Sequence, residues 1–149
     1  MIYFESIDEI IEIHKKTVEY SGGGANGILK PEYLDSALEH IKNDDYYPTF
    51  EEKICHLFWS FNKNHIFQDG NKRMAITVSV MFLMKNGYMN IAKRFLTEME
   101  SISYHVAAGN INKELLLKII KSFLFEDDYS EELKLEILEA FSKGLASDI

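Results

Sequence analysis

The chain has 149 residues, enough for one domain with a substantial hydrophobic core. Hydrophobic residues make up 46% of it and charged residues 27%, a balance that is too apolar for intrinsic disorder. The formal net charge of -8 argues against a general nucleic-acid binder, because such proteins carry a basic surface for the phosphates. We therefore expect no direct nucleic-acid binding.

Apolar residues recur at helical intervals through most of the chain. The spacing predicts helices from residue 7 to the glycine-rich break at 21–24, and over about 31–41, 50–63, 72–85, 96–108, 113–125 and 131–142. Residues 43–49 are polar and aromatic and predict an exposed loop or short hairpin. Residues 88–91 predict a short extended segment that pairs with residues 2–4. The helix over 72–85 is apolar on nearly every side, so we place it at the centre of an all-α domain.

Cysteine content and charge distribution indicate the cellular setting. The single cysteine, Cys55, has no partner for an internal disulfide, and its surroundings suggest a small buried apolar residue. The longest stretch without a charge, 74–84, is about half the length that a bilayer span needs. The first residues also lack the basic region of a signal peptide. We expect a soluble, cytoplasmic protein with no membrane contact.

The stretch from His65 to Arg73, HIFQDGNKR, brings together an imidazole, a carboxylate, an amide and two cations before the most buried helix. The amino end of a helix is a ready anion site, and Gly70 would let a backbone N–H approach a phosphate closely. Lys72 would add charge, and Asp69 could hold a divalent metal ion beside the same phosphates.

Two further residues of the stretch complete a possible transfer site. His65 suits a general base, because an imidazole exchanges protons near neutral pH, and Phe67 would point inward and fix the loop. Together these groups are typical of phosphoryl or nucleotidyl transfer. From composition alone, the same residues also suit a plain turn that leads into a helix, with both cations in solvent.

The order and spacing of these residues resemble the signature loop of the Fic/Doc family, His-x-Phe-x-Asp/Glu-Gly-Asn-Gly/Lys-Arg. The similarity covers roughly residues 1–125, and three further segments resemble the death-on-curing (Doc) branch: 27–38, 47–53 and 82–88. The resemblance implies a Fic-type helical domain over 1–126 that includes a short β flap. Residues 127–149 would form a helical extension; it could cover a groove or mediate self-association, but we expect it to pack on the domain.

The resemblance implies a role for each matching residue. His65 would be the general base for a protein hydroxyl, and Asp69 the ligand of a magnesium ion. Gly70 and Asn71 would lie in the anion hole, and Lys72 and Arg73 would bind the phosphates of ATP, the co-substrate. The target-docking flap would consist of Asn43, Asp44, Asp45, Tyr46 and Tyr47.

The residue types at two positions favour one of the family's reactions. Adenylylating members usually have Gly where this chain has Lys72, and a second Arg where it has Ile76. The Doc branch has the same Lys, and the resemblance implies that its nucleotide binds reversed, with the γ-phosphate facing the histidine. We therefore expect phosphate transfer to a Ser or Thr of a host protein, for which the family suggests a translation factor. Adenylylation is the alternative, since Asp69-Gly70 also fits it, and an inactive binding scaffold is a second alternative.

The resemblance to the Doc branch implies that the protein acts as a toxin. Restraint of such a toxin is expected to come from a separate protein. The nearest match to the family's inhibitory helix, Ser122 to Glu126, is better explained by core packing, so we expect an antitoxin resembling the Phd partner of the Doc branch. The remaining histidines, His14, His40, His56 and His105, show no ligand spacing, and we expect them at the surface or at interfaces.

Overall fold

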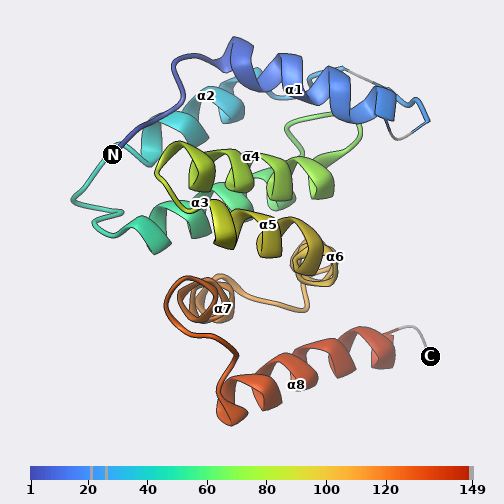
Figure 1. Ribbon diagram of the computed structural model, residues 1–149. Helices are drawn as coiled ribbons and strands as arrows, with labels where there is room; N and C mark the ends of the chain where they lie inside the picture. Colours follow the sequence, from blue (N-terminus) through green and yellow to red (C-terminus); the bar gives the residue numbers. More distant parts are fainter. Residues whose placement is uncertain (21, 26, 148–149) are drawn as a thin grey trace.

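The computed structural model describes residues 1–20, 22–25 and 27–147 of the chain. The described residues form eight α-helices and no β-strand, which confirms the predicted all-α class. The helices are α1 (Ile7–Tyr20), α2 (Pro31–His40), α3 (Phe50–Lys63), α4 (Asn71–Lys85), α5 (Met89–Glu98), α6 (Glu100–Ala107), α7 (Lys113–Phe125) and α8 (Glu131–Ser147). Figure 1 shows them stacked from α1 at the top of the view to α8 at the bottom.

Helix α4 lies at the centre, as its composition predicts. It packs against α1, α3, α5 and α6. Its buried residues face all of these neighbours: Met74, Ala75, Ile76, Val78, Ser79, Val80, Phe82 and Leu83. A helix that is apolar on nearly every side loses the most contact with water in this position. The amino end of α4 is therefore fixed by packing on several sides.

Side-chain caps set the starts of two helices. The Oγ1 of Thr49 accepts a hydrogen bond from the N–H of Glu52 at 3.2 Å, at the start of α3. The Oδ1 of Asn112 accepts one from the N–H of Leu115 at 2.8 Å, at the start of α7. Each cap satisfies an N–H group that has no partner within the helix. Both helices begin where the sequence predicts.

Two predictions for the middle of the chain are wrong. Residues 89–91 belong to α5 rather than to an extended segment, and a break at Met99 divides the predicted helix over 96–108 into α5 and α6. The amino-terminal segment meets a side chain instead of a strand. The amide of Asn86 accepts from Ile2 N at 2.8 Å and donates to Ile2 O at 3.0 Å. These are the backbone groups that strand pairing would have used.

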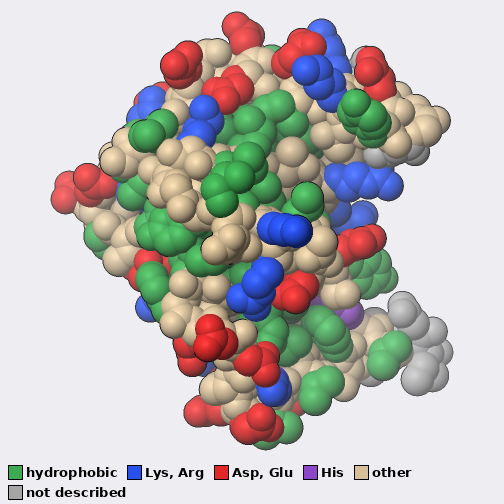
Figure 2. Space-filling model, in the orientation of Figure 1, with side chains coloured by type: hydrophobic (Ala, Val, Ile, Leu, Met, Phe, Trp, Pro, Cys, Tyr) green, Lys and Arg blue, Asp and Glu red, His purple; other side chains and the backbone are tan. Residues whose placement is uncertain are grey.

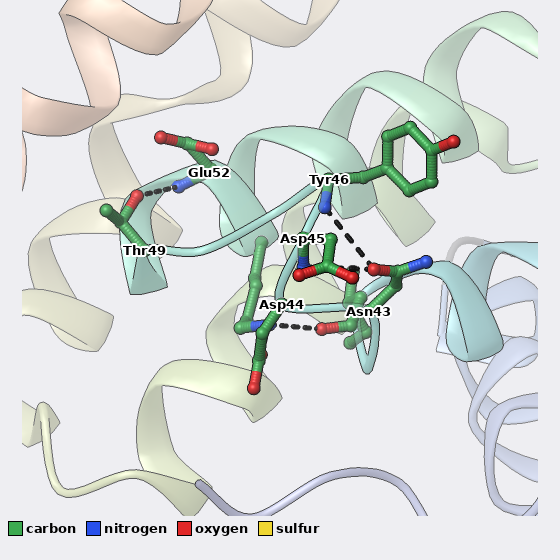
Figure 3. A network of polar contacts seen from close by, with 8 residues as sticks. Asn43, Asp44, Asp45, Tyr46, Thr49 and Glu52 are labelled. Atoms are coloured by element: carbon green, nitrogen blue, oxygen red, sulfur yellow. Dashed lines mark hydrogen bonds and ion pairs between the residues drawn. The ribbon is translucent and has the colours of Figure 1, made fainter.

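Residues 43–49 form turns and bends, so the predicted loop is present and the predicted short β flap is not shown. The Oδ1 of Asn43 accepts hydrogen bonds from the N–H groups of Asp45 at 3.0 Å and Tyr46 at 3.3 Å (Figure 3). The buried ammonium of Lys53 forms an ion pair with Asp44 at 2.7 Å and also donates to Ile41 O. These bonds hold residues 43–46 in an exposed turn rather than in an extended strand.

Helix α8 packs against α6 and α7 through Leu133, Ile137 and Ala140, which are buried. It runs five residues further than the predicted end at residue 142. The extension over 127–149 is thus held to the rest of the molecule over the described part of α8. No helix among the described residues is both long enough and apolar enough to span a membrane.

Candidate active site

The HIFQDGNKR stretch forms the loop between α3 and the amino end of α4, and its apolar residues anchor it. Ile66 and Phe67 are fully buried. The Phe67 ring lies between two others: the His14 ring is stacked on it with centroids 3.9 Å apart, and the Phe61 ring lies at 6.2 Å. The prediction that Phe67 points inward agrees with this packing.

The side chain of Asn71 closes the loop. Its Oδ1 accepts from Phe67 N at 3.0 Å, and its Nδ2 donates to Phe67 O at 2.9 Å. The side-chain amide is therefore used within the loop itself. If Asn71 contributes to an anion hole, it does so through its backbone N–H in the first turn of α4.

A second segment holds the loop from the other side. Residues Ile28 and Phe67 form an antiparallel bridge. The N–H groups of Leu29 and Lys30 donate to Ile66 O, and the N–H of Gln68 donates to Gly27 O at 2.9 Å. A Cβ at Gly24 would lie 2.6 Å from the Asp69 carboxylate, so the glycine-rich segment passes close over that side chain.

His14 contacts the loop, although the sequence prediction places it at the surface or at an interface. It is 1% exposed rather than at the surface, and its Nε2 lies 2.7 Å from the backbone oxygen of Asp69. A carbonyl oxygen only accepts, so Nε2 carries the proton. The sequence indicates burial of His14, because it falls within the apolar series that begins at Ile7 and ends at Val18, but it does not indicate the contact with Asp69.

Gly70 begins α4 in a left-handed conformation, with φ of 81°. Its N–H donates to Oδ1 of Asp69 at 2.8 Å. A negative group therefore already lies at the amino end of the helix, where the helix dipole favours it. His65 is likewise left-handed, with φ of 49°, and its side chain is exposed.

A cavity of about 480 Å³ opens at this end of α4. Five predicted site residues line it: Asp69, Gly70, Asn71, Lys72 and Arg73. Its other walls come from α1, α5 and α6, and two carboxylates, those of Asp69 and Glu100, lie among its lining. Lys and Arg side chains gather at the right edge of Figure 2, beside the amino end of α4. The lining therefore carries two cations and two carboxylates beside the amino end of a helix, where the helix dipole favours a negative group.

Predicted residues outside the cavity take different positions. His65 and Phe67 are not among the lining residues. The five residues of the expected flap lie before α3, whereas His65 follows it. A helix of 14 residues is about 21 Å long, so the two features lie at opposite ends of α3. It is the segment over 27–30 that lies beside the loop, and the docking role of Asn43–Tyr47 stays a prediction.

The Fic/DOC family model matches residues 4–83, which is more than half of the chain and includes all of the HIFQDGNKR stretch. The chain belongs to the Fic/DOC family. This membership supports a protein-modifying enzyme in general. Among curated proteins, none matched the chain.

Asp69 is the predicted magnesium ligand of this Fic/DOC protein. The described residues contain no group of three or more His, Cys, Asp or Glu side chains that could hold a metal ion. Magnesium does not need such a group, since one or two carboxylates together with substrate phosphates commonly hold it. Asp69 lines the cavity and is exposed, so it fits a magnesium ion bound together with a nucleotide.

The inhibitory helix of self-restrained relatives has no counterpart at this cavity within the described residues. Ser122 is buried in α7, and together with Glu126 it lines a separate, smaller cavity between α5 and the carboxyl end of α7. Burial in α7 agrees with the prediction that this segment serves core packing.

Two other histidines meet although their spacing does not suggest it. Nδ1 of His40 lies 3.2 Å from Nε2 of His56, and Nζ of Lys113 donates to Nδ1 of His56 at 3.2 Å. Burial, together with the charge of Lys113, lowers the pKa of His56 to about 3. Next to it, burial raises the pKa of the Cys55 thiol to about 12, which removes it as a nucleophile at neutral pH.

Proposed function

We propose that this Fic/DOC protein transfers the γ-phosphate of ATP to a Ser or Thr hydroxyl of a host protein. The observation that carries the proposal is the cavity at the amino end of α4, with Gly70, Lys72 and Arg73 in its lining. Such a cavity offers backbone N–H groups, a helix dipole and two cations to a polyphosphate. The hydroxyl of a protein is the expected acceptor because His65 is exposed and lies outside the cavity.

The transfer follows from the roles of the chain's own residues. His65 accepts the proton of the target hydroxyl as its oxygen attacks the γ-phosphorus. The bond between that phosphorus and the β,γ-bridging oxygen breaks, and ADP leaves. Lys72 and Arg73 bind the phosphates and neutralise their charge. Asp69 would hold a magnesium ion, which supplies charge neutralisation at the phosphates when it is bound.

Lys72 and Ile76 favour one orientation of the nucleotide. Both line the cavity; Lys72 is exposed, and Ile76 is 8% exposed. A lysine side chain fills space that a glycine would leave for a diphosphate against the loop. Ile76 brings no charge where adenylylating relatives have a second arginine. Both features favour the reversed nucleotide, whose γ-phosphate faces His65.

Adenylylation is the second candidate, since the Asp69-Gly70 pair also fits adenylylating relatives. In that reaction the hydroxyl attacks the α-phosphorus and pyrophosphate leaves. We further propose that the protein acts as a toxin, with a translation factor as the family-based target. A separate antitoxin resembling Phd would restrain it, which is consistent with the position of Ser122 away from the cavity.

Labelled ATP separates these reactions. The protein, magnesium and a bacterial lysate are incubated with ATP labelled at the γ-phosphate or at the α-phosphate, and His65→Ala serves as the control. We expect label from the γ-position alone on a protein band, and none with His65→Ala. Label from the α-position would establish adenylylation, and label that survives in His65→Ala would exclude His65 as the base.

The Lys72→Gly variant tests the orientation argument in the same assay. We expect label from the α-position to increase relative to label from the γ-position, because the space filled by the lysine becomes free. An unchanged ratio would mean that Lys72 does not set the orientation. Absence of label from both positions, with purified candidate targets as well, would favour the inactive scaffold.

A further inference from the structure

His14 lies under the peptide group that joins Asp69 to Gly70. It comes from α1, 55 positions earlier in the chain, and its Nε2–H donates to Asp69 O at 2.7 Å. A Cβ placed at Gly70 would lie 3.6 Å from the same nitrogen, so the imidazole is in direct contact with the start of α4. His14 is buried, and its ring is also stacked on Phe67.

The hydrogen bond to Asp69 O determines where the N–H of Gly70 points. Both atoms belong to one peptide group, and the C=O and N–H of a trans peptide point in opposite directions. With the oxygen held toward α1, the N–H is turned away from it and donates to the Asp69 carboxylate at 2.8 Å. Glycine tolerates either orientation of this peptide, so the backbone of Gly70 does not fix the direction by itself.

We infer that His14 is a positioning residue for phosphate binding: it holds the Asp69–Gly70 peptide so that the Gly70 N–H faces an anion. The inference rests on the proposed function, because the anion would be a phosphate of ATP. The Gly70 N–H already donates to the carboxylate of Asp69, so in this orientation it is able to bind a negative group. The donor nitrogen of His14, rather than its bulk, is the part that matters.

A matched pair of variants separates the donor from the bulk. Gln and Met side chains have nearly the same length, and both lack the ring that His14 stacks on Phe67. Only Gln carries an N–H donor. ATP affinity is measured by calorimetry with magnesium for His14→Gln and His14→Met. Both are made in the His65→Ala background so that transfer does not consume the nucleotide. The melting temperature of each protein is recorded alongside.

We expect His14→Met to bind ATP about tenfold more weakly than the protein with His14, and His14→Gln to stay within about threefold. His56→Met is the control for losing a buried histidine away from the loop, and its ATP affinity should not change. If His14→Met loosens the fold, His14→Phe replaces it, since it keeps a ring against Phe67 without a donor. The same loss is expected for it.

Two results would contradict the inference in different ways. Equal ATP affinity of the Gln and Met proteins, while the protein with His14 binds ATP, would overturn the positioning role and leave the proposed function intact. No ATP binding by the protein with His14 would overturn the proposed function, and the inference with it.

Discussion

Asn71 and Arg73 are two positions apart at the amino end of α4, yet their side chains have different surroundings. Asn71 makes two hydrogen bonds with the backbone of Phe67. Arg73 is exposed and lines the cavity. One side chain therefore maintains the loop and the other faces the cavity, although the family motif contains both.

This difference predicts that Asn71→Ala mainly lowers stability and that Arg73→Ala mainly weakens ATP binding. Asn71→Ala should lower the free energy of unfolding by about 1–3 kcal/mol, since it leaves backbone groups of Phe67 without partners. Arg73→Ala should change stability by less than about 0.5 kcal/mol. It should weaken ATP binding by about tenfold or more, as expected for the loss of a charge-assisted contact. Urea denaturation and calorimetry measure the two quantities. A large stability loss in Arg73→Ala would show that its side chain is structural.

At the scale of elements, α8 presents one face to the domain and another to solvent. Ile137 is 8% exposed and faces α6 and α7, whereas its neighbour Leu138 is 59% exposed. Consecutive residues of a helix point in directions about 100° apart, so neighbouring side chains have different surroundings.

Alanine substitutions of these two neighbours show whether stability depends on the burial of a side chain rather than on its hydrophobicity alone. Ile137→Ala should cost about 2–4 kcal/mol of stability, because it removes buried methyl groups and leaves a cavity. Leu138→Ala should cost less than about 0.5 kcal/mol. Urea denaturation of both variants provides the comparison. Equal, small effects would mean that α8 does not pack on the domain in solution.

The elements also show what the sequence could predict. Helices with a side-chain cap, α3 and α7, and the helix that is apolar on nearly every side, α4, begin and end within a residue of their predicted positions. The break at Met99 was missed because the apolar pattern continues across it. At the predicted flap, Asn43 forms a local turn that its residue type allows, whereas the ion pair of Lys53 with Asp44 depends on packing of α3 that the local sequence does not show.

The candidate site likewise has a part that the sequence predicts and a part that it does not. Its nine-residue loop was recognisable because the chemistry lies within one short stretch. The contact of His14 with Asp69 and the pairing of residues 27–30 with the loop join segments distant in the chain. The meeting of His40 with His56 is likewise set by packing of α2 on α3. A single sequence carries no direct signal for such contacts.

At the scale of the whole molecule, His56 links stability to pH. It is contacted by Lys113, His40 and Ser60, and the ring of Tyr47 lies 4.4 Å from its own. Burial is the main cause that lowers the pKa of His56 from 6.5 to about 3. Between these values the unfolded chain binds a proton that the folded protein does not, so acid favours unfolding there.

Stability should therefore fall as the pH is lowered from about 6.5 toward 3, with His56 responsible for part of the loss. The free energy of unfolding is measured across this range for the wild-type protein and for His56→Gln, which cannot titrate there. We expect the wild-type curve to be steeper, so that the advantage of the wild-type protein over the variant shrinks in acid. Parallel curves would mean that another group dominates the acid response.

The contact between His14 and the Asp69–Gly70 peptide has a consequence for how the motif can be reused. The nine residues of the loop take their shape from α1 and from residues 27–30. A peptide that contains only the loop and α4 would lack the imidazole, the bridging segment and the ring under Phe67. If the nine residues were grafted into an unrelated helical protein, they would therefore lack the contacts that orient their backbone amides.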